Sequence, residues 1–239
     1  MRSLKDLSPL AIIFFTALLI LGVRLLVRPT PAPAVLKTVI VREGLTVDEI
    51  DKLLADEGII PLRSLPESLE GYLFPDTYEF FVPQSPATVL HKFTDNFDRR
   101  VRSIVPEGTD LKKIITVASL IEKEAPDSYD RRIISGIIWK RLTANIPLQI
   151  DSSICYIKDG QGCLPITDDD YKIDSPYNTY LYKGLPPGPI GNPGKDSIEA
   201  SLYPEKSPYL FYLTNPKDRK TVFATNFEEH KRNIIKYLR

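Results

Sequence analysis

Glutamates next to apolar residues are the side chains of this sequence best suited to proton transfer. Residues 109–125 carry apolar side chains at the three- and four-residue spacing of an amphipathic helix. At 100° per residue, Glu122 falls within about 50° of the centre of this stripe, whereas Lys123 and Glu124 point away. Leu120 falls on the outer face as well, so the stripe is broad. We expect Glu122 to face the packed side of the helix.

An inward-facing glutamate has two interpretations. An apolar setting raises the pKa of a carboxyl group, which can then hold and deliver a proton near neutral pH. The alternative is a structural role, in which Glu122 pairs with an arginine of the following helix. The candidate partners are Arg131, Arg132 and Arg141.

A second group of residues suits carbohydrate. Tyrosine rings stack on the flat apolar faces of sugars, and amide and hydroxyl groups bond to sugar hydroxyls. Such groups cluster at Tyr177, Asn178, Thr179 and Tyr180. Residues 184–194 follow, and eight of these eleven are Gly or Pro. This composition indicates a stiff, shaped loop of the kind that often lines a binding site.

Composition and charge exclude several classes of protein. The 239 residues include 31 Lys+Arg and 31 Asp+Glu, so no basic excess points to nucleic acid. A hydrophobic content of 43% excludes a disordered chain. Two Cys and two His are too few for a zinc cluster, and the acidic run 168–170 reads as a solvated loop. We expect no metal, no cofactor and no nucleic-acid partner.

The first 34 residues predict a membrane anchor. Residues 9–27 form an apolar run of nearly the length that a bilayer requires, interrupted near its end by Arg24. A cleaved signal peptide is the alternative. In the anchor interpretation, residues 1–8 are cytoplasmic, 28–34 form a Pro-rich tether, and the body is extracytoplasmic on the cell membrane.

The body is predicted to be α+β. Residues 35–64 read as a small β-α module, whose helix begins at a capping box of Thr46 and Glu49. Residues 65–239 read as the larger main domain, in which a second capping box at Thr225 and Glu228 opens the last helix. The further predicted elements are helices at 85–104, 109–125, 129–143 (capped by Ser128) and 197–202, and a strand pair at 209–213 and 221–224.

The two cysteines flank a turn signal. Residues 148–164 read as a hairpin because Asp159-Gly160 is a strong hairpin turn. A hairpin would bring Cys155 and Cys163 together, and a disulfide would suit an extracytoplasmic body. The sequence leaves a disulfide and two free thiols equally open.

Several motifs together resemble the MltG/YceG-like family of endolytic murein transglycosylases. They occur in order over residues 38–239, with an N-terminal anchor ahead of them as in that family. They are LEGYLFPDTYEF (69–80), ASLIEKEA (118–125), LQIDSSICY (148–156), SPYNTYLYKGLPPGPIGNPG (175–194) and an AT-N ending near residue 226. The family's LysM-like module is reduced here, within residues 35–64.

The resemblance implies cleavage of the β-1,4 bond between N-acetylmuramic acid and N-acetylglucosamine in nascent peptidoglycan strands. The muramic C6 hydroxyl attacks C1, so the product carries a 1,6-anhydro end. One carboxyl group serves first as acid and then as base. The family motif matches this group to Glu122, with Glu124 as the alternative.

The resemblance also implies substrate-binding residues and partners. The expected substrate-binding residues are Gln149, Asp151, Tyr177, Asn178, Thr179, Tyr180, Gly184, Pro186, Pro187 and Gly188. Weaker candidates are Glu70, Tyr72, Phe74, Asp76 and Tyr78. The implied partners are peptidoglycan glycan strands, the cell membrane and penicillin-binding synthases.

Two other functions remain open from the sequence. The first is a non-catalytic peptidoglycan-binding anchor or scaffold. The second is a hydrolase, in which a second carboxylate such as Asp151 positions water and the products carry reducing ends.

Overall fold

The computed structural model describes residues 13, 14, 16, 18, 35–125, 127–158, 163 and 165–238. The chain divides into two compact units, Met1–Val35 and Leu36–Arg239. Residues 13, 14, 16 and 18 of the first unit are helical. Within the described part of the chain, no helix is both long and apolar enough to span a membrane. The predicted segments 1–8, 9–27 and 28–34 otherwise lie outside the described residues.

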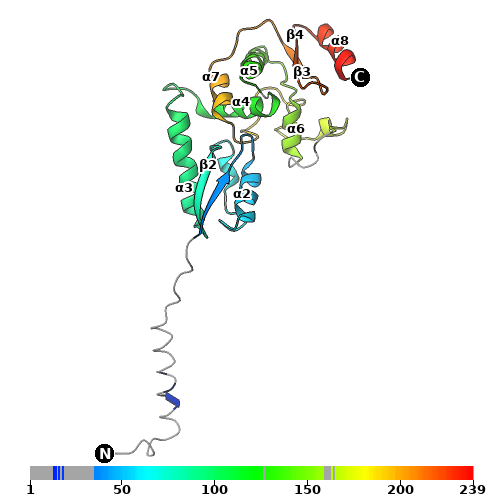
Figure 1. Cartoon of the computed structure of the whole chain (residues 1–239). Helices are drawn as coiled ribbons and strands as arrows, with labels where there is room; N and C mark the ends of the chain where they lie inside the picture. Colours follow the sequence, from blue (N-terminus) through cyan, green and yellow to red (C-terminus); the bar gives the residue numbers. More distant parts are fainter. Residues whose placement is uncertain are drawn as a thin grey trace, which may run out of the picture. The chain divides into compact units, whose positions relative to one another are not determined.

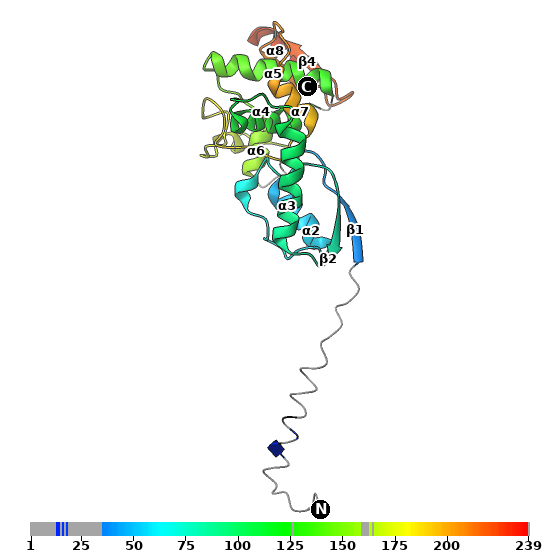
Figure 2. The ribbon, with the colours of Figure 1, turned by 90° about the vertical axis from the view of Figure 1, so that its left-hand side faces the viewer.

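The second unit begins with two strands and two helices that share one hydrophobic core. Thr46 and Glu49 form the predicted capping box at the start of the first of these helices. Figure 2 shows the strands side by side with the helices next to them, and the core joins all four. The elements are β1 (Val35–Ile40), α2 (Val47–Asp56), β2 (Thr77–Val82) and α3 (Pro86–Phe97), with a 3-10 turn at Glu67–Leu69.

The core of this front region extends well beyond residue 64. It runs from Val39 to Phe93 and includes Tyr78 and Phe80 of β2. A single strand and helix bury too little apolar surface to be stable, so β2 and α3 complete the layer. The β-α module therefore shares its core with β2 and α3, whereas Phe74 and Phe97 pack against α4 (Leu111–Glu124).

Four helices form the second half of the unit. They are α4 (Leu111–Glu124), α5 (Ser128–Thr143), α6 (Asp151–Ile157) and α7 (Lys195–Leu202). Helix α4 contacts the other three (Figure 1). Every residue from Ile114 to Ile121 is therefore buried, which explains why Leu120 does not fit a one-sided stripe. The cap of α5 is Asp127 and not Ser128, because its carboxylate accepts the first free amides of the helix.

The C-terminal part is a hairpin followed by a helix. Strands β3 (Phe211–Thr214) and β4 (Thr221–Ala224) pair antiparallel, with Phe211 opposite Ala224, and α8 is Phe227–Leu238. The predicted capping box is shifted by one residue. Asn226 accepts the amide of Glu229, and the Glu229 carboxylate accepts the amide and hydroxyl of Thr225.

The predicted hairpin at 148–164 is wrong, because residues 151–157 form helix α6. The amide and hydroxyl of Ser153 both donate to the Ile150 carbonyl, and Asp151 lies in the first turn, where the helix dipole favours a carboxylate. Asp159 and Gly160 lie outside the described residues. Cys155 and Cys163 form a disulfide. Short helical segments also occur at Asp98–Arg102 and Asp170–Lys172.

Candidate active site

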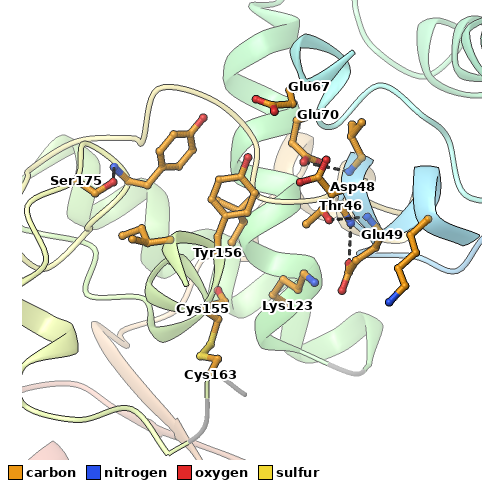
Figure 3. Close-up of a pocket in the computed structure, with 16 residues that line it drawn as sticks. Thr46, Asp48, Glu49, Glu67, Glu70, Lys123, Cys155, Tyr156, Cys163 and Ser175 are labelled. Atoms are coloured by element: carbon orange, nitrogen blue, oxygen red, sulfur yellow. Dashed lines mark hydrogen bonds between the residues drawn. A yellow bond between two sulfur atoms is a disulfide. The ribbon is translucent and has the colours of Figure 1, made fainter. Parts of the chain in front are cut away.

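A cavity of about 1000 Å³ lies between the front region and the helical half of this unit. Figure 3 shows Asp48 and Glu70 on one side of it and Tyr156 and Ser175 on the other, with Lys123 of α4 between them. The front wall comes from the start of α2 and from residues 67–70, and the opposite wall comes mainly from α6 and residues 175–177. The cavity combines aromatic, hydroxyl and carboxylate groups, as a polar sugar ligand requires.

The aromatic part of the wall consists of Tyr156 and Tyr177. Their ring centroids lie 4.9 Å apart, and burial raises the pKa of both phenols. Both therefore stay neutral hydrogen-bond donors at physiological pH. A Cβ atom on Gly188 would lie 3.3 Å from the Tyr177 hydroxyl, so glycine leaves room for this ring.

Glu122 is buried and paired. Its Oε1 accepts a hydrogen bond from Arg131 at 2.9 Å, and its Oε2 accepts the Gly194 amide at 2.9 Å. The exposed fractions of the two side chains are only 6% for Glu122 and 9% for Arg131. Arg131 also donates to the Ala125 carbonyl at the end of α4. This is the geometry that the structural interpretation of Glu122 predicts.

Glu124 lies in a different environment, although it is only two residues away. Its Oε2 accepts the Tyr212 hydroxyl at 3.1 Å. Burial raises the pKa of Glu124, Asp151 adds to the shift, and the nearby Ser152 and Tyr212 oppose it. The Ser152 hydroxyl itself makes no well-formed hydrogen bond among the described residues. Glu124 as a residue is half-buried, as Glu122 is, and no cation of the described residues forms a salt bridge with it.

Glu70 is a second carboxyl group with a raised pKa, and it lines the cavity directly. Burial raises its pKa to about 7, against the opposing effects of the Val47 amide and Lys123. Its Oε2 accepts the Val47 amide at 3.2 Å, and its Oε1 accepts the Asn192 side chain at 3.1 Å. Glu70 therefore lines the cavity and also connects the start of α2 to Asn192.

The expected residue Asp151 lies near Glu124, and the expected residue Tyr180 bonds to Asp151. The Tyr180 hydroxyl donates to Asp151, and the Tyr171 hydroxyl donates to the same oxygen at 3.3 Å. Asp151 is exposed at the start of α6. Gln149 is exposed with a φ of 53°, and its amide donates to the Thr179 carbonyl.

Asn178 and Thr179 do not face the cavity. Both are buried, with exposed fractions of 0% and 2%. The Asn178 amide group donates to the carbonyls of Tyr171 and Ile173, and the Thr179 hydroxyl accepts the Ile150 amide. Their polar groups bond within the protein, and neither residue is among those that line the cavity.

The Gly/Pro loop is divided between two surfaces. Gly188 and Ile190 adjoin the cavity, whereas Pro186 and Pro187 line a separate hollow beside the start of α4. Gly184 has a φ of 91° and open space around its Cβ position. Of these expected residues, only Gly188 is thus brought to the cavity, through Tyr177.

Several cavity residues, including Ser152 and Tyr156, are not among the residues predicted from the sequence. Both lie in the motif 148–156, and their four-residue spacing would have placed them on one face of a helix. In a hairpin, residues at this spacing carry no such meaning, so the helix face was not predicted. Among the described residues, no group of three His, Cys, Asp or Glu side chains could hold a metal ion.

Comparisons with known proteins identify the family. The model of the YceG-like family matches residues 23–236, so the chain belongs to this family, as its motifs predicted. A crystal structure of a putative yceG-like protein from Listeria monocytogenes has a TM-score of 0.72 and 33% identity. The match covers 85% of this chain and 76% of that chain.

Curated relatives include two endolytic murein transglycosylases. The one from Bacillus subtilis is 36% identical over 181 residues, which is 74% of this chain and 50% of that protein. The one from Streptococcus pneumoniae is 32% identical over 222 residues, covering 82% of this chain and 40% of that protein. The chain spans half or less of the length of these relatives.

Proposed function

We propose that this protein is an endolytic lytic transglycosylase of peptidoglycan. It cleaves the bond between N-acetylmuramic acid and N-acetylglucosamine within a nascent strand and forms 1,6-anhydro ends. The observation that carries the proposal is a half-buried carboxyl group of raised pKa, Glu124, whose neighbours Lys123 and Ser152 line a cavity with tyrosine walls. The names of the curated relatives support it.

We assign the acid/base role to Glu124 in place of Glu122. A general acid must hold a proton in the free enzyme, and burial without a cationic partner favours the protonated form. Glu122 instead accepts two hydrogen bonds, one of them from a buried arginine, and both require its carboxylate oxygens as acceptors. Its role in this proposal is to hold the end of α4.

The reaction needs one carboxyl group and consumes no water. Protonated Glu124 donates to the glycosidic oxygen as the bond from C1 to that oxygen breaks. The resulting carboxylate takes the proton from the muramic C6 hydroxyl as its oxygen bonds to C1, and Glu124 is protonated again. The Tyr212 hydroxyl, which donates to Glu124, stabilises the intermediate carboxylate.

In this proposal the cavity binds the glycan strand. Tyr156 and Tyr177 provide ring surface and phenol donors for sugar rings and hydroxyls, and Ser175 adds a hydroxyl group. Asp151, held by Tyr180, lies close enough to Glu124 to raise its pKa and to contact a sugar near the cleaved bond.

The remaining proposals concern location and partners. The apolar run 9–27 supports a single-pass anchor in the cell membrane with a cytoplasmic N-terminus and an extracytoplasmic body. An anchored enzyme would meet strands as they are made, near penicillin-binding synthases. The disulfide supports an oxidising compartment.

Mass spectrometry of glycan strands incubated with the full-length protein tests the function. We expect internal cuts with 1,6-anhydro-muramic ends. Reducing ends would instead identify a hydrolase, and strands that bind without being cut would identify a scaffold.

A further inference from the structure

Asn192 of the Gly/Pro loop connects three separate segments of the chain. It is fully buried, and its Oδ1 accepts the Leu73 amide at 2.8 Å. Its Nδ2 donates to the Leu45 carbonyl at 2.9 Å and to Glu70 at 3.1 Å. Its backbone exchanges hydrogen bonds with Gly44 and Leu45. A residue with this many bonds fixes the loop, the turn before α2 and the segment after Glu70 relative to one another.

The same segments are in contact at positions that accept only glycine. A Cβ atom on Gly191 would lie 2.6 Å from the Gly44 carbonyl oxygen, and one on Gly71 would lie 2.5 Å from Pro189. The close approach therefore continues on both sides of Asn192. These contacts lie at the base of the cavity, which Glu70 and Ile190 line.

Glu70 extends this connection to the front wall. By accepting the Val47 amide, it holds the first turn of α2, which carries Asp48 and Glu49 into the cavity lining. No described cation forms a salt bridge with Glu70. Burying a carboxylate without such a partner costs free energy. If Glu70 had only a structural role, a neutral side chain at this position would make the protein more stable.

We propose that Glu70 and Asn192 are positioning residues, which hold the α2 wall of the cavity against the Gly/Pro loop in the arrangement that binds the glycan strand. This inference rests on the proposed function. It makes the front region a part of the substrate site, because these two side chains, together with the backbone bonds of Asn192, connect the α2 wall of the cavity to the Gly/Pro loop.

The charge of Glu70 sets the strength of this connection. Hydrogen bonds to an ionised carboxylate are about twice as strong as neutral ones. The groups that face Glu70 are Asp48 and Lys123, with the neutral phenols of Tyr156 and Tyr177. Because the pKa of Glu70 is about 7, we expect KM for glycan strands to fall as pH rises through neutrality.

The test is the Glu70→Gln variant of the full-length protein. Glutamine keeps one acceptor oxygen, but its NH₂ group must face either the Val47 amide or the Asn192 NH₂ group, and both are donors. We expect KM to increase about ten-fold and to lose its pH dependence near neutrality, with kcat within about two-fold of wild type. Glu107→Gln, an exposed position outside the cavity lining, is the matched control.

Stability measurements separate positioning from folding. A carboxyl group with a raised pKa binds more protons in the folded state, so wild-type stability falls as pH rises from about 4.5 through about 7. Glu70→Gln removes this loss and should be at least as stable as wild type at higher pH. An increased KM in a variant of equal or higher stability is a result that a structural role alone would not produce.

A second substitution tests whether the two residues act together. Asn192→Asp places a carboxylate against Glu70 and should increase KM more than Glu70→Gln does. In the double variant, the NH₂ group of the introduced glutamine can donate to the introduced carboxylate, so KM should fall below that of Asn192→Asp alone. Independent effects of the two changes would contradict the proposal.

Two further outcomes overturn the inference. The first is a Glu70→Gln variant with the KM and pH dependence of wild type, and the second is an increased KM that follows only from lost stability. If the wild type does not cut strands, the proposed function fails, and the connection is then judged by NMR. The Val47 amide should titrate near pH 7 in wild type and not in Glu70→Gln, and an unchanged titration would refute it.

Discussion

Glu122 and Glu124 lie two residues apart on one helix and have different surroundings. Side chains at this spacing do not share a helix face, so each meets its own surroundings. Glu122 accepts hydrogen bonds from Arg131 and the Gly194 amide. Glu124 accepts a hydrogen bond from Tyr212 and is half-buried, with no cationic partner among the described residues. Helix periodicity correctly placed Glu122 inward. Periodicity alone leaves the choice between a catalytic role and an arginine partner open, and the structure shows that Arg131, one of the predicted partners, pairs with Glu122.

Tyr212→Phe should change the pH profile of catalysis. The Tyr212 hydroxyl lowers the pKa of Glu124 by stabilising its carboxylate, so its removal raises that pKa further. The acid form of Glu124 then persists to higher pH, so we expect the basic limb of the kcat/KM profile to move to higher pH. The comparison variant is Tyr209→Phe, two residues before β3, whose ring stacks on Phe223 and whose hydroxyl makes no hydrogen bond among the described residues. A shift of the basic limb to lower pH would contradict a stabilising hydrogen bond from Tyr212 to the Glu124 carboxylate.

Arg131→Met should destabilise the protein by about 3 kcal/mol or more, measured by denaturant unfolding. The substitution leaves the buried Glu122 carboxylate without its cation and removes the bond to the Ala125 carbonyl. Arg102→Met is the comparison, because Arg102 forms only an exposed pair with Asp98 and its loss should change stability by about 0.5 kcal/mol or less. Equal effects of the two substitutions would disprove a structural role for the Glu122 pair.

At the scale of elements, local signals predicted most of the helices and the β3–β4 hairpin. The capping box at Thr46 and the periodicity of α4 are examples in which local and tertiary preferences agree. Helix α6 is the main exception. The turn signal at Asp159-Gly160 predicts a hairpin for this segment. In the structure, Ile154 is buried in the interior and the Ser153 hydroxyl donates to the Ile150 carbonyl. Tertiary packing decided the structure of this short segment.

Reduction of the disulfide should loosen the end of α6. Cys155 and Cys163 are 8 residues apart, and a closed loop of this size stabilises the folded state by about 2 to 3 kcal/mol in the chain-entropy model. We expect the denaturant midpoint of the full-length protein to fall on addition of a phosphine reductant, and to be unaffected by it in a Cys155→Ser/Cys163→Ser variant. An unchanged midpoint in wild type would show that the bond adds no stability.

At the scale of the whole unit, the cavity could not be predicted from the sequence. Its walls come from residues 46–52, 67–70, 123, 152–157, 163, 175–177 and 190. No periodic pattern links these segments, and only the tertiary fold brings them together. The motifs of the resemblance named several of the segments but not which side chains face the cavity.

Gly71→Ala should destabilise the protein more than Gly58→Ala does. Both glycines have a positive φ, at 87° and 69°, so alanine strains the backbone at either position. A Cβ atom at Gly58 meets no atom within 4 Å, whereas one at Gly71 would lie 2.5 Å from Pro189 and 2.7 Å from Ile115. We expect a difference of about 1 to 3 kcal/mol in the free energy of unfolding. Equal losses would mean that the segments approach less closely than described.

The most direct test of the account is to compare the kcat of Glu124→Gln and Glu122→Gln, with circular dichroism to establish that both are folded. Removal of a general acid lowers rates by about 10²- to 10⁴-fold. We predict that Glu124→Gln loses about 10³-fold in kcat while still binding glycan strands, and that Glu122→Gln keeps turnover within about ten-fold of wild type at lower stability. Loss of turnover in folded Glu122→Gln, with Glu124→Gln still active, would contradict the assignment of the acid to Glu124.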